Sequence, residues 1–230
     1  MPYRLPFENA IRGIRFQPIY SVAEKVINAW EILTLLQPGI NHERYFISQS
    51  DRSCLNILCW QLQIIYRMKN RKRYYLNVPA RLLCFSMVVE QLLPWLREGI
   101  VLEVQDPHGF ILLSDAERQA FYAHARMIKS MGAELWLDDV LLEQFSDLKA
   151  ELVLFDGVKI DKSVLQDPSS LNQLIASCTR HVKSVLVEGV ENSQHFNIAE
   201  EGGSHFLQGF MWPEEQFFIT YTPGLPCLRF

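Results

Sequence analysis

Six short apolar runs in this sequence carry polar or ionisable residues at or near their carboxyl ends. The runs are YYLNVPA, IVLEVQD, LWLDD, VKID, SVLVEGVE and HFLQGF, and the residues are Asn77, Glu103, Asp138, Asp139, Lys159, Glu188, Glu191 and Gln208. A carboxylate in an apolar strand is costly to bury unless a cation or a hydrogen-bond donor offsets its charge. Several carboxylates with one lysine among them therefore predict strands that converge on a single charged site suited to catalysis.

The runs that would position these residues alternate with segments of helical periodicity. Helices are expected near 51–68, 82–96, 114–131, 169–179 and 193–201. Ser114 and Glu117 have the spacing of a capping box, and Gly132 fits the end of the same helix. Strands and helices that alternate without long linkers, with nearly eight strand-like runs, predict a parallel sheet.

A barrel explains the polar strand ends better than an open sheet. In a barrel many strands bring their carboxyl ends to one mouth, whereas an open sheet has a single switch point. The first two strand-like runs, IRFQPIYSV and VINAWEILTLL, are separated by only a few residues around Glu24 and Lys25. Because this link is too short for a crossover helix, we expect these two strands to pair antiparallel.

Composition narrows the function classes. A chain of 230 residues with 49% hydrophobic and 21% charged residues is typical of one globular domain. A net charge of −4 and a pI near 5.9 argue against direct nucleic-acid binding, and no apolar run approaches a membrane span. The five cysteines lack metal-ligand spacing, which is typical of free thiols in the reducing cytoplasm, the location that we expect.

In this order the strings resemble the EAL domains, bacterial phosphodiesterases of the second messenger cyclic di-GMP. FQPIY is similar to the opening strand of that family, and WEIL stands where its E-A-L signature belongs. LNV, LEVQD, LDD, VKID, VEGVE and LQGF then follow in family order, and the likeness is strongest over 16–213. The resemblance implies one domain over 1–230, an α/β fold of the modified (β/α)8, TIM-like barrel type with an antiparallel first strand pair.

The resemblance also implies roles for the residues at the mouth. In active members two Mg²⁺ or Mn²⁺ ions activate water for attack on one phosphodiester. One ion would be held by Glu31, Asn77, Glu103 and Asp138, and the other by Asp138, Asp139 and Glu188. Lys159 would orient the water, Glu191 and Gln208 would support the ligands, and Gln17 would contact the dinucleotide. The alternative is a buried ion network around Lys159, which would leave several negative charges uncompensated.

Four positions depart from the family pattern. Leu35 stands in place of an arginine that binds a phosphate of the dinucleotide in the family. An apolar side chain cannot make that charged contact. Leu141 and Glu143 replace both glycines of the loop that follows the aspartate pair, so this loop cannot readily adopt the family conformation. The adjacent leucines favour a helix there. Asp106 stands in place of the longer glutamate that anchors the loop.

The metal-binding carboxylates are thus retained, which favours catalysis, whereas the phosphate-binding residue and the loop have changed, which argues against it. The favoured hypothesis is a degenerate EAL regulator that has lost most or all hydrolysis and binds a protein, the flagellar master transcription activator, with weak or no cyclic di-GMP binding. The first alternative is an active phosphodiesterase that produces linear pGpG with two divalent metals. The second alternative is a sensor that binds cyclic di-GMP without cutting it.

Overall fold

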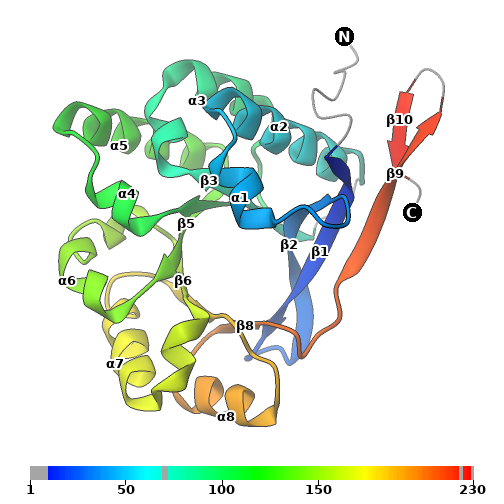
Figure 1. Ribbon diagram of the computed structural model, residues 1–230. Helices are drawn as coiled ribbons and strands as arrows, with labels where there is room; N and C mark the ends of the chain where they lie inside the picture. The colour runs from blue at the N-terminus through cyan, green and yellow to red at the C-terminus, as the bar shows by residue number, and fades with distance from the viewer. Residues whose placement is uncertain (1–9, 69–71, 223–224, 229–230) are drawn as a thin grey trace.

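The computed structural model describes residues 10–68, 72–222 and 225–228 and shows a closed eight-stranded barrel surrounded by helices (Figure 1). In chain order its strands are β1 (Ile11–Ser21), β2 (Val26–Leu36), β3 (Arg73–Pro79), β4 (Ile100–Gln105), β5 (Glu134–Val140), β6 (Gly157–Ile160), β7 (Ser184–Val187) and β8 (Phe206–Gln208). Each strand pairs with the next in sequence, and β8 pairs with β1 to close the barrel. The predicted α/β barrel is confirmed.

Antiparallel pairs flank the first strand of this barrel. β1 and β2 run antiparallel, with Gln17 directly opposite Glu31, and only residues 22–25 connect them. From β2 to β8 every neighbouring pair is parallel, whereas β8 meets β1 antiparallel. A link of this length cannot hold a crossover helix, so the antiparallel first pair predicted from the sequence is confirmed.

The inward-facing residues of the eight strands form two layers. The lower layer is apolar or small and comprises Ile19, Ala29, Tyr75, Val101, Trp136, Gly157, Leu186 and Phe206. Two residues nearer the mouth, the same strands carry Gln17, Glu31, Asn77, Glu103, Asp138, Lys159, Glu188 and Gln208. Because strand side chains alternate between faces, a spacing of two puts both layers inside the barrel. The interior is therefore apolar at one end and polar at the mouth.

The longer helices pack around the outside and follow the predictions closely (Figure 1). They are α2 (Asp51–Met68), α5 (Asp115–Ser130), α7 (Pro168–Cys178) and α8 (Ser193–Glu201). The capping box is present, with the Ser114 N–H donating to Glu117 Oε2 at 3.0 Å. Gly132, with φ of 88°, follows α5 in the left-handed conformation that favours glycine. Shorter helices are α1 (His42–Ile47), α3 (Ser86–Leu92), α4 (Pro107–Ile111) and α6 (Phe145–Leu148).

The prediction of a single helix near 82–96 was wrong. The chain forms a 3-10 helix at Ala80–Cys84, then α3, then a second 3-10 helix at Leu93–Trp95. Phe85 interrupts the helical backbone with extended angles, φ −101° and ψ 120°. The pieces on both sides of Phe85 bury apolar residues against one core, so the helical spacing of those residues carries no sign of the break.

Two further strands lie outside the barrel and were not predicted. β9 (Glu215–Thr222) pairs antiparallel with β1, and β10 (Leu225–Leu228) pairs with β9 (Figure 1). Gly13 permits this approach, since a Cβ there would lie 2.0 Å from the carbonyl oxygen of Phe217. The pairing brings residues 213–214 beside β1. Within the described ranges, no helix combines the length and hydropathy that crossing a bilayer requires.

Candidate metal centre at the barrel mouth

Lys159 on β6 is the centre of the polar layer. Its side chain is 1% exposed, and its Nζ lies 2.7 Å from Glu188 Oε1, 3.0 Å from Glu103 Oε1, and 3.2 Å from both Glu31 Oε2 and Asp138 Oδ1. These carboxylates come from β2, β4, β5 and the end of β7, which are far apart in sequence. The polar strand ends therefore converge on one point, as the sequence predicts.

Glu31 is held by donors on three sides. Asn77 Nδ2 donates to its Oε1 at 2.7 Å, and Gln208 Nε2 donates to its Oε2 at 2.6 Å. Lys159 donates to the same Oε2. Burial opposes ionisation of Glu31, but the Lys159 ammonium and the two amides together hold the pKa of this carboxyl below its usual value. Glu31 is therefore an anion in the folded protein at neutral pH.

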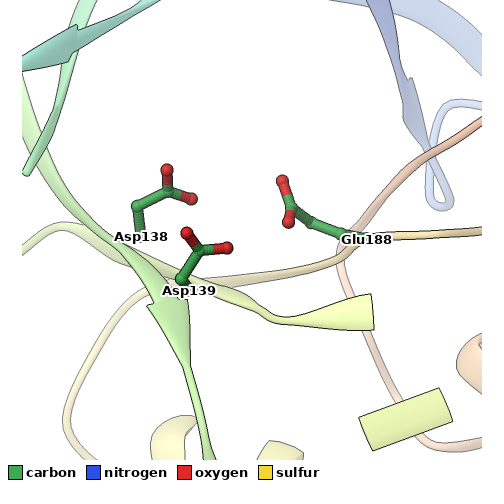
Figure 2. Close-up of side chains that lie close together, drawn as sticks. All are labelled: Asp138, Asp139 and Glu188. Atoms are coloured by element: carbon green, nitrogen blue, oxygen red, sulfur yellow. The ribbon is translucent and has the colours of Figure 1, made fainter. Parts of the chain in front are cut away.

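Asp138 and Asp139 both reach the mouth because β5 is irregular there. Successive residues of a regular strand face opposite sides, so only one of two adjacent aspartates could point inward. Asp139 has a left-handed backbone with φ of 53°, and the pairing of β5 with β6 shifts between Leu137 and Val140. As Figure 2 shows, both aspartates and Glu188 turn their carboxyl groups toward one another, with one oxygen from each within 4.8 Å of the others.

Burial raises the pKa of the remaining carboxyl groups of the mouth. The pKa values of Glu103 and Asp138 lie well above their usual range, first because both groups are buried and then because other carboxylates surround them. Burial also leads the rise in pKa of Asp139 and Glu188. For Lys159 burial alone would lower the pKa, but the carboxylates around it, Asp138 foremost, raise it well above its usual value. Lys159 is therefore charged at neutral pH.

The charge balance and donor atoms of this cluster fit divalent cations. Five carboxylates, those of Glu31, Glu103, Asp138, Asp139 and Glu188, share one ammonium, so four negative charges are uncompensated when all are ionised. Two divalent cations would balance that charge. At this cluster, the buried oxygens without a hydrogen bond are both carboxylate oxygens of Glu103, Asp138 Oδ1, Asn77 Oδ1 and Gln208 Oε1. Two of these oxygens, Glu103 Oε1 and Asp138 Oδ1, form ion pairs with the Lys159 ammonium, at 3.0 and 3.2 Å. Mg²⁺ and Mn²⁺ prefer such oxygen ligands.

A cavity of about 1140 Å³ opens beside the cluster. Asn77 and Asp139 lie in its wall, and so do Leu33 of β2, His42 and Phe46 of α1, Arg81 and Leu141. Its volume is at or slightly above the upper end of typical small-molecule sites, about 300–1,000 Å³. The mouth therefore combines oxygen ligands for cations with room for a ligand of nucleotide size.

A model of the EAL domain matches residues 7–214 of this sequence. The chain belongs to the EAL domain family. Three solved structures show the same fold at low identity. The manganese and cyclic di-GMP complex of Klebsiella pneumoniae BlrP1 has a TM-score of 0.72 and 19% identity, over 94% of this chain and 58% of that chain. An EAL domain protein from Listeria monocytogenes has a TM-score of 0.71 and 18% identity, over 91% and 90%.

The third is the EAL domain of Pseudomonas aeruginosa FimX bound to cyclic di-GMP, with a TM-score of 0.72 and 17% identity, over 92% of this chain and 93% of that one. This chain thus spans little more than half of BlrP1 but nearly all of the other two. Comparison with curated proteins gave no match.

Two of the positions that depart from the EAL pattern, Leu35 and Asp106, lie on β2 and at the start of α4. Leu35 shares the inward face of β2 with Glu31 and is 9% exposed. Asp106 has a left-handed backbone, φ 59°, and caps α4 by accepting the Gly109 N–H at 2.9 Å. The shorter Asp106 side chain thus forms its hydrogen bond within its own segment, at the start of α4.

The segment after the aspartate pair is helical, as the sequence predicts. Leu142–Gln144 form a 3-10 helix that leads directly into α6. The Leu141 N–H donates to Gln144 Oε1 at 3.2 Å, and Leu141 and Leu142 pack against the main core, whereas Glu143 is exposed. Apolar packing, rather than glycine flexibility, therefore fixes this segment of the EAL domain.

Two predicted residues lie at the edge of the assembled EAL site. Gln17 is opposite Glu31 in the β1–β2 pairing and is partly buried on the inner face. Glu191 is exposed, and its backbone N–H donates to His195 Nδ1 at 3.4 Å. Its place in the support of the ligands stays a prediction, as do the individual roles of the other mouth residues.

Sequence reasoning missed the residues at the rim on the β1 side. Arg15 of β1 forms an ion pair with Glu214, at 3.0 Å between Nη1 and Oε2, and His42 of α1 is close by. A signal for Arg15 was present, because it precedes Gln17 by two residues and so shares its strand face. The contact with Glu214 could not be read from the sequence, since 199 residues separate the partners.

Proposed function

We propose that this EAL domain binds cyclic di-GMP at the barrel mouth and hydrolyses one of its phosphodiester bonds with divalent cations. The observation that carries the proposal is the set of carboxylate and amide oxygens that converge at the mouth, several of them buried and without a hydrogen bond. The BlrP1 complex contains manganese and cyclic di-GMP, and the FimX EAL domain is bound to cyclic di-GMP, which makes this ligand the natural candidate.

The protein groups have distinct tasks in this proposal. Glu31, Asn77, Glu103, Asp138, Asp139 and Glu188 would hold the cations, which when bound supply Lewis acidity and lower the pKa of water. Lys159, whose ammonium stays charged, would orient the water next to Glu188 and Asp138. The apolar layer below, with Trp136 and Tyr75, closes the far end of the barrel to solvent.

The leucine at position 35 lowers the affinity for cyclic di-GMP that we expect. An arginine that grips phosphate contributes a charged hydrogen bond of about 1.5–3 kcal/mol, which leucine cannot supply. We therefore expect weaker dinucleotide binding than in EAL domains that have this arginine, unless another cation compensates. Leu35→Arg should raise the affinity about tenfold or more.

The deciding experiment incubates purified protein with cyclic di-GMP and Mn²⁺ and follows the linear dinucleotide by chromatography. We expect slow turnover that Glu103→Gln and Asp138→Asn each abolish, while Asp106→Asn, which keeps a side-chain acceptor for the α4 cap, retains it. Absence of product over hours would reject hydrolysis. Binding without product would instead identify a cyclic di-GMP sensor.

A second candidate is the protein-binding regulator, for which the rim offers one specific observation. Phe210 is 74% exposed and Met211 is 39% exposed, and both follow Gln208 at the mouth. Exposed large apolar residues are enriched at protein interfaces. A pull-down with the flagellar master transcription activator, using Phe210→Ser as the matched variant, tests this candidate. No capture by the wild type, with unchanged motility on overexpression, would reject it.

A further inference from the structure

Arg15 lies above the polar layer on the inward face of β1. Gln17 and Ile19 face the barrel interior, and alternation along the strand gives Arg15 the same direction. The pairing of β1 with β2 is regular here, with Gln17 opposite Glu31 and Arg15 opposite Leu33. Because β1 runs away from the mouth, Arg15 is nearer the opening than Gln17, one step beyond the layer that contains Glu31.

Glu214 fixes the guanidinium of Arg15 from one side. Arg15 Nη1 donates to Glu214 Oε2 at 3.0 Å and to Oε1 at 3.3 Å, and the two side chains are only 24% and 15% exposed. Glu214 is held there because the next residue, Glu215, pairs with Phe16. Arg15 Nε is buried and has no hydrogen-bond partner. A buried donor of a charged group without a partner is costly, which indicates a site for an acceptor.

A strand neighbour of Arg15 lines the cavity, although Arg15 itself is not one of the lining residues. Leu33, its partner on β2, lies in the cavity wall, and so does His42. Burial, and then the positive charge of Arg15, lowers the pKa of His42. Leu35 is the diagonal neighbour of Arg15 on the same face, within reach of a long side chain.

We propose that Arg15 binds a phosphate oxygen of the phosphodiester ligand at the mouth, with Glu214 as its positioning residue. The inference rests on the proposed function and deepens it by naming a phosphate-binding residue on β1. A guanidinium suits this task because its planar donors match phosphate oxygens and its charge does not titrate. The carboxylate cluster would repel the phosphate unless cations are bound, so Arg15 acts together with the metal-loaded centre.

The test measures cyclic di-GMP binding by calorimetry for the wild type, Arg15→Gln, Arg15→Lys and Arg12→Gln. Ca²⁺ serves as the cation, since calcium accompanies the substrate cyclic di-GMP in the complex of Bacillus subtilis YkuI. Arg12 is the matched control, because its guanidinium already stacks on Phe218 of β9, 4.5 Å from the ring centroid, at the irregular start of the same strand. The shift in thermal midpoint on adding Mn²⁺ without nucleotide reports whether the metal centre is intact.

We expect Arg15→Gln to weaken cyclic di-GMP binding about tenfold to a hundredfold, the loss of one charged hydrogen bond. Arg15→Lys should recover part of the loss, Arg12→Gln should bind like the wild type, and the Mn²⁺ shift should be unchanged in all four proteins. Equal binding by Arg15→Gln and wild type, or an equal loss in Arg12→Gln, would overturn the role of Arg15.

A second ligand, the model diester bis(p-nitrophenyl) phosphate, separates this proposal from the proposed function. If the wild type binds the model diester but not cyclic di-GMP, and Arg15→Gln loses that binding, Arg15 keeps its role and the proposed substrate is wrong. If the metal-loaded wild type binds neither compound, both proposals are overturned.

Discussion

Replacement of Lys159 by methionine is the sharpest test of how the polar layer is held together. Methionine keeps most of the length of the side chain and removes its only charge. In the metal-free protein the four carboxylates that lie 2.7–3.2 Å from Nζ would then face one another without a counter-ion. Removing one partner of a buried ion pair costs about 3–5 kcal/mol, and for a 230-residue chain this lowers the thermal midpoint by about 6–20 °C.

The cost should depend on pH in a defined direction. Burial already raises the pKa of Glu103 and Asp138 well above the usual range, and loss of the ammonium would raise both further. A carboxyl group whose folded pKa exceeds its unfolded pKa makes the folded state bind more protons, so stability falls as pH rises between the two values. Lys159→Met should therefore lose less stability at pH 5, where these groups can take up protons, than at pH 8.

The assay is urea unfolding in EDTA at both pH values. Lys183→Met is the matched control, because its side chain is 84% exposed and its ion pair with Asp156, at 3.5 Å, should contribute less than about 1 kcal/mol. Added Mn²⁺ should recover part of the loss at pH 8, since cations would replace the missing positive charge. A loss no greater than that of Lys183→Met, or one that is equal at both pH values, would refute the reasoning.

Three further expectations follow from the same contacts. Mn²⁺ at about a hundred times its Kd should stabilise the wild type by about 2.7 kcal/mol in thermal unfolding. It should bind more tightly at pH 8 than at pH 6, because the raised pKa values of Glu103 and Asp138 make protons compete with the metal. An Mn²⁺ affinity that is the same at both pH values would contradict this. Gly157→Ala should destabilise by about 1–3 kcal/mol in urea unfolding, since its Cβ would lie 2.4 Å from the Trp136 ring, and a neutral result would show that the ring can move. Ser114→Ala should cost about 1 kcal/mol through the lost capping box of α5, and Ser146→Ala, at an exposed site, should cost less in the same assay.

The polar residues of the mouth could be predicted because their placement follows a simple strand rule. In β3, β4 and β5 an apolar inward residue is followed two positions later by Asn77, Glu103 or Asp138, and the alternation of strand faces is a local property of the chain. Asp139 could be named but not placed. Its inward direction depends on a left-handed backbone and a shifted β5–β6 pairing, which no periodicity reports.

Residue types and spacing by themselves determined the barrel, its antiparallel first pair, the polar layer and the family of this protein. These depend on strand alternation, link length and the order of short strings, all of which are local along the chain. The tertiary structure decided that Lys159 touches four carboxylates from four strands and that Arg15 meets Glu214, 199 residues away. Contacts of this kind depend on how barrel closure and the β1–β9 pairing bring distant segments together, and local sequence carries no record of that geometry.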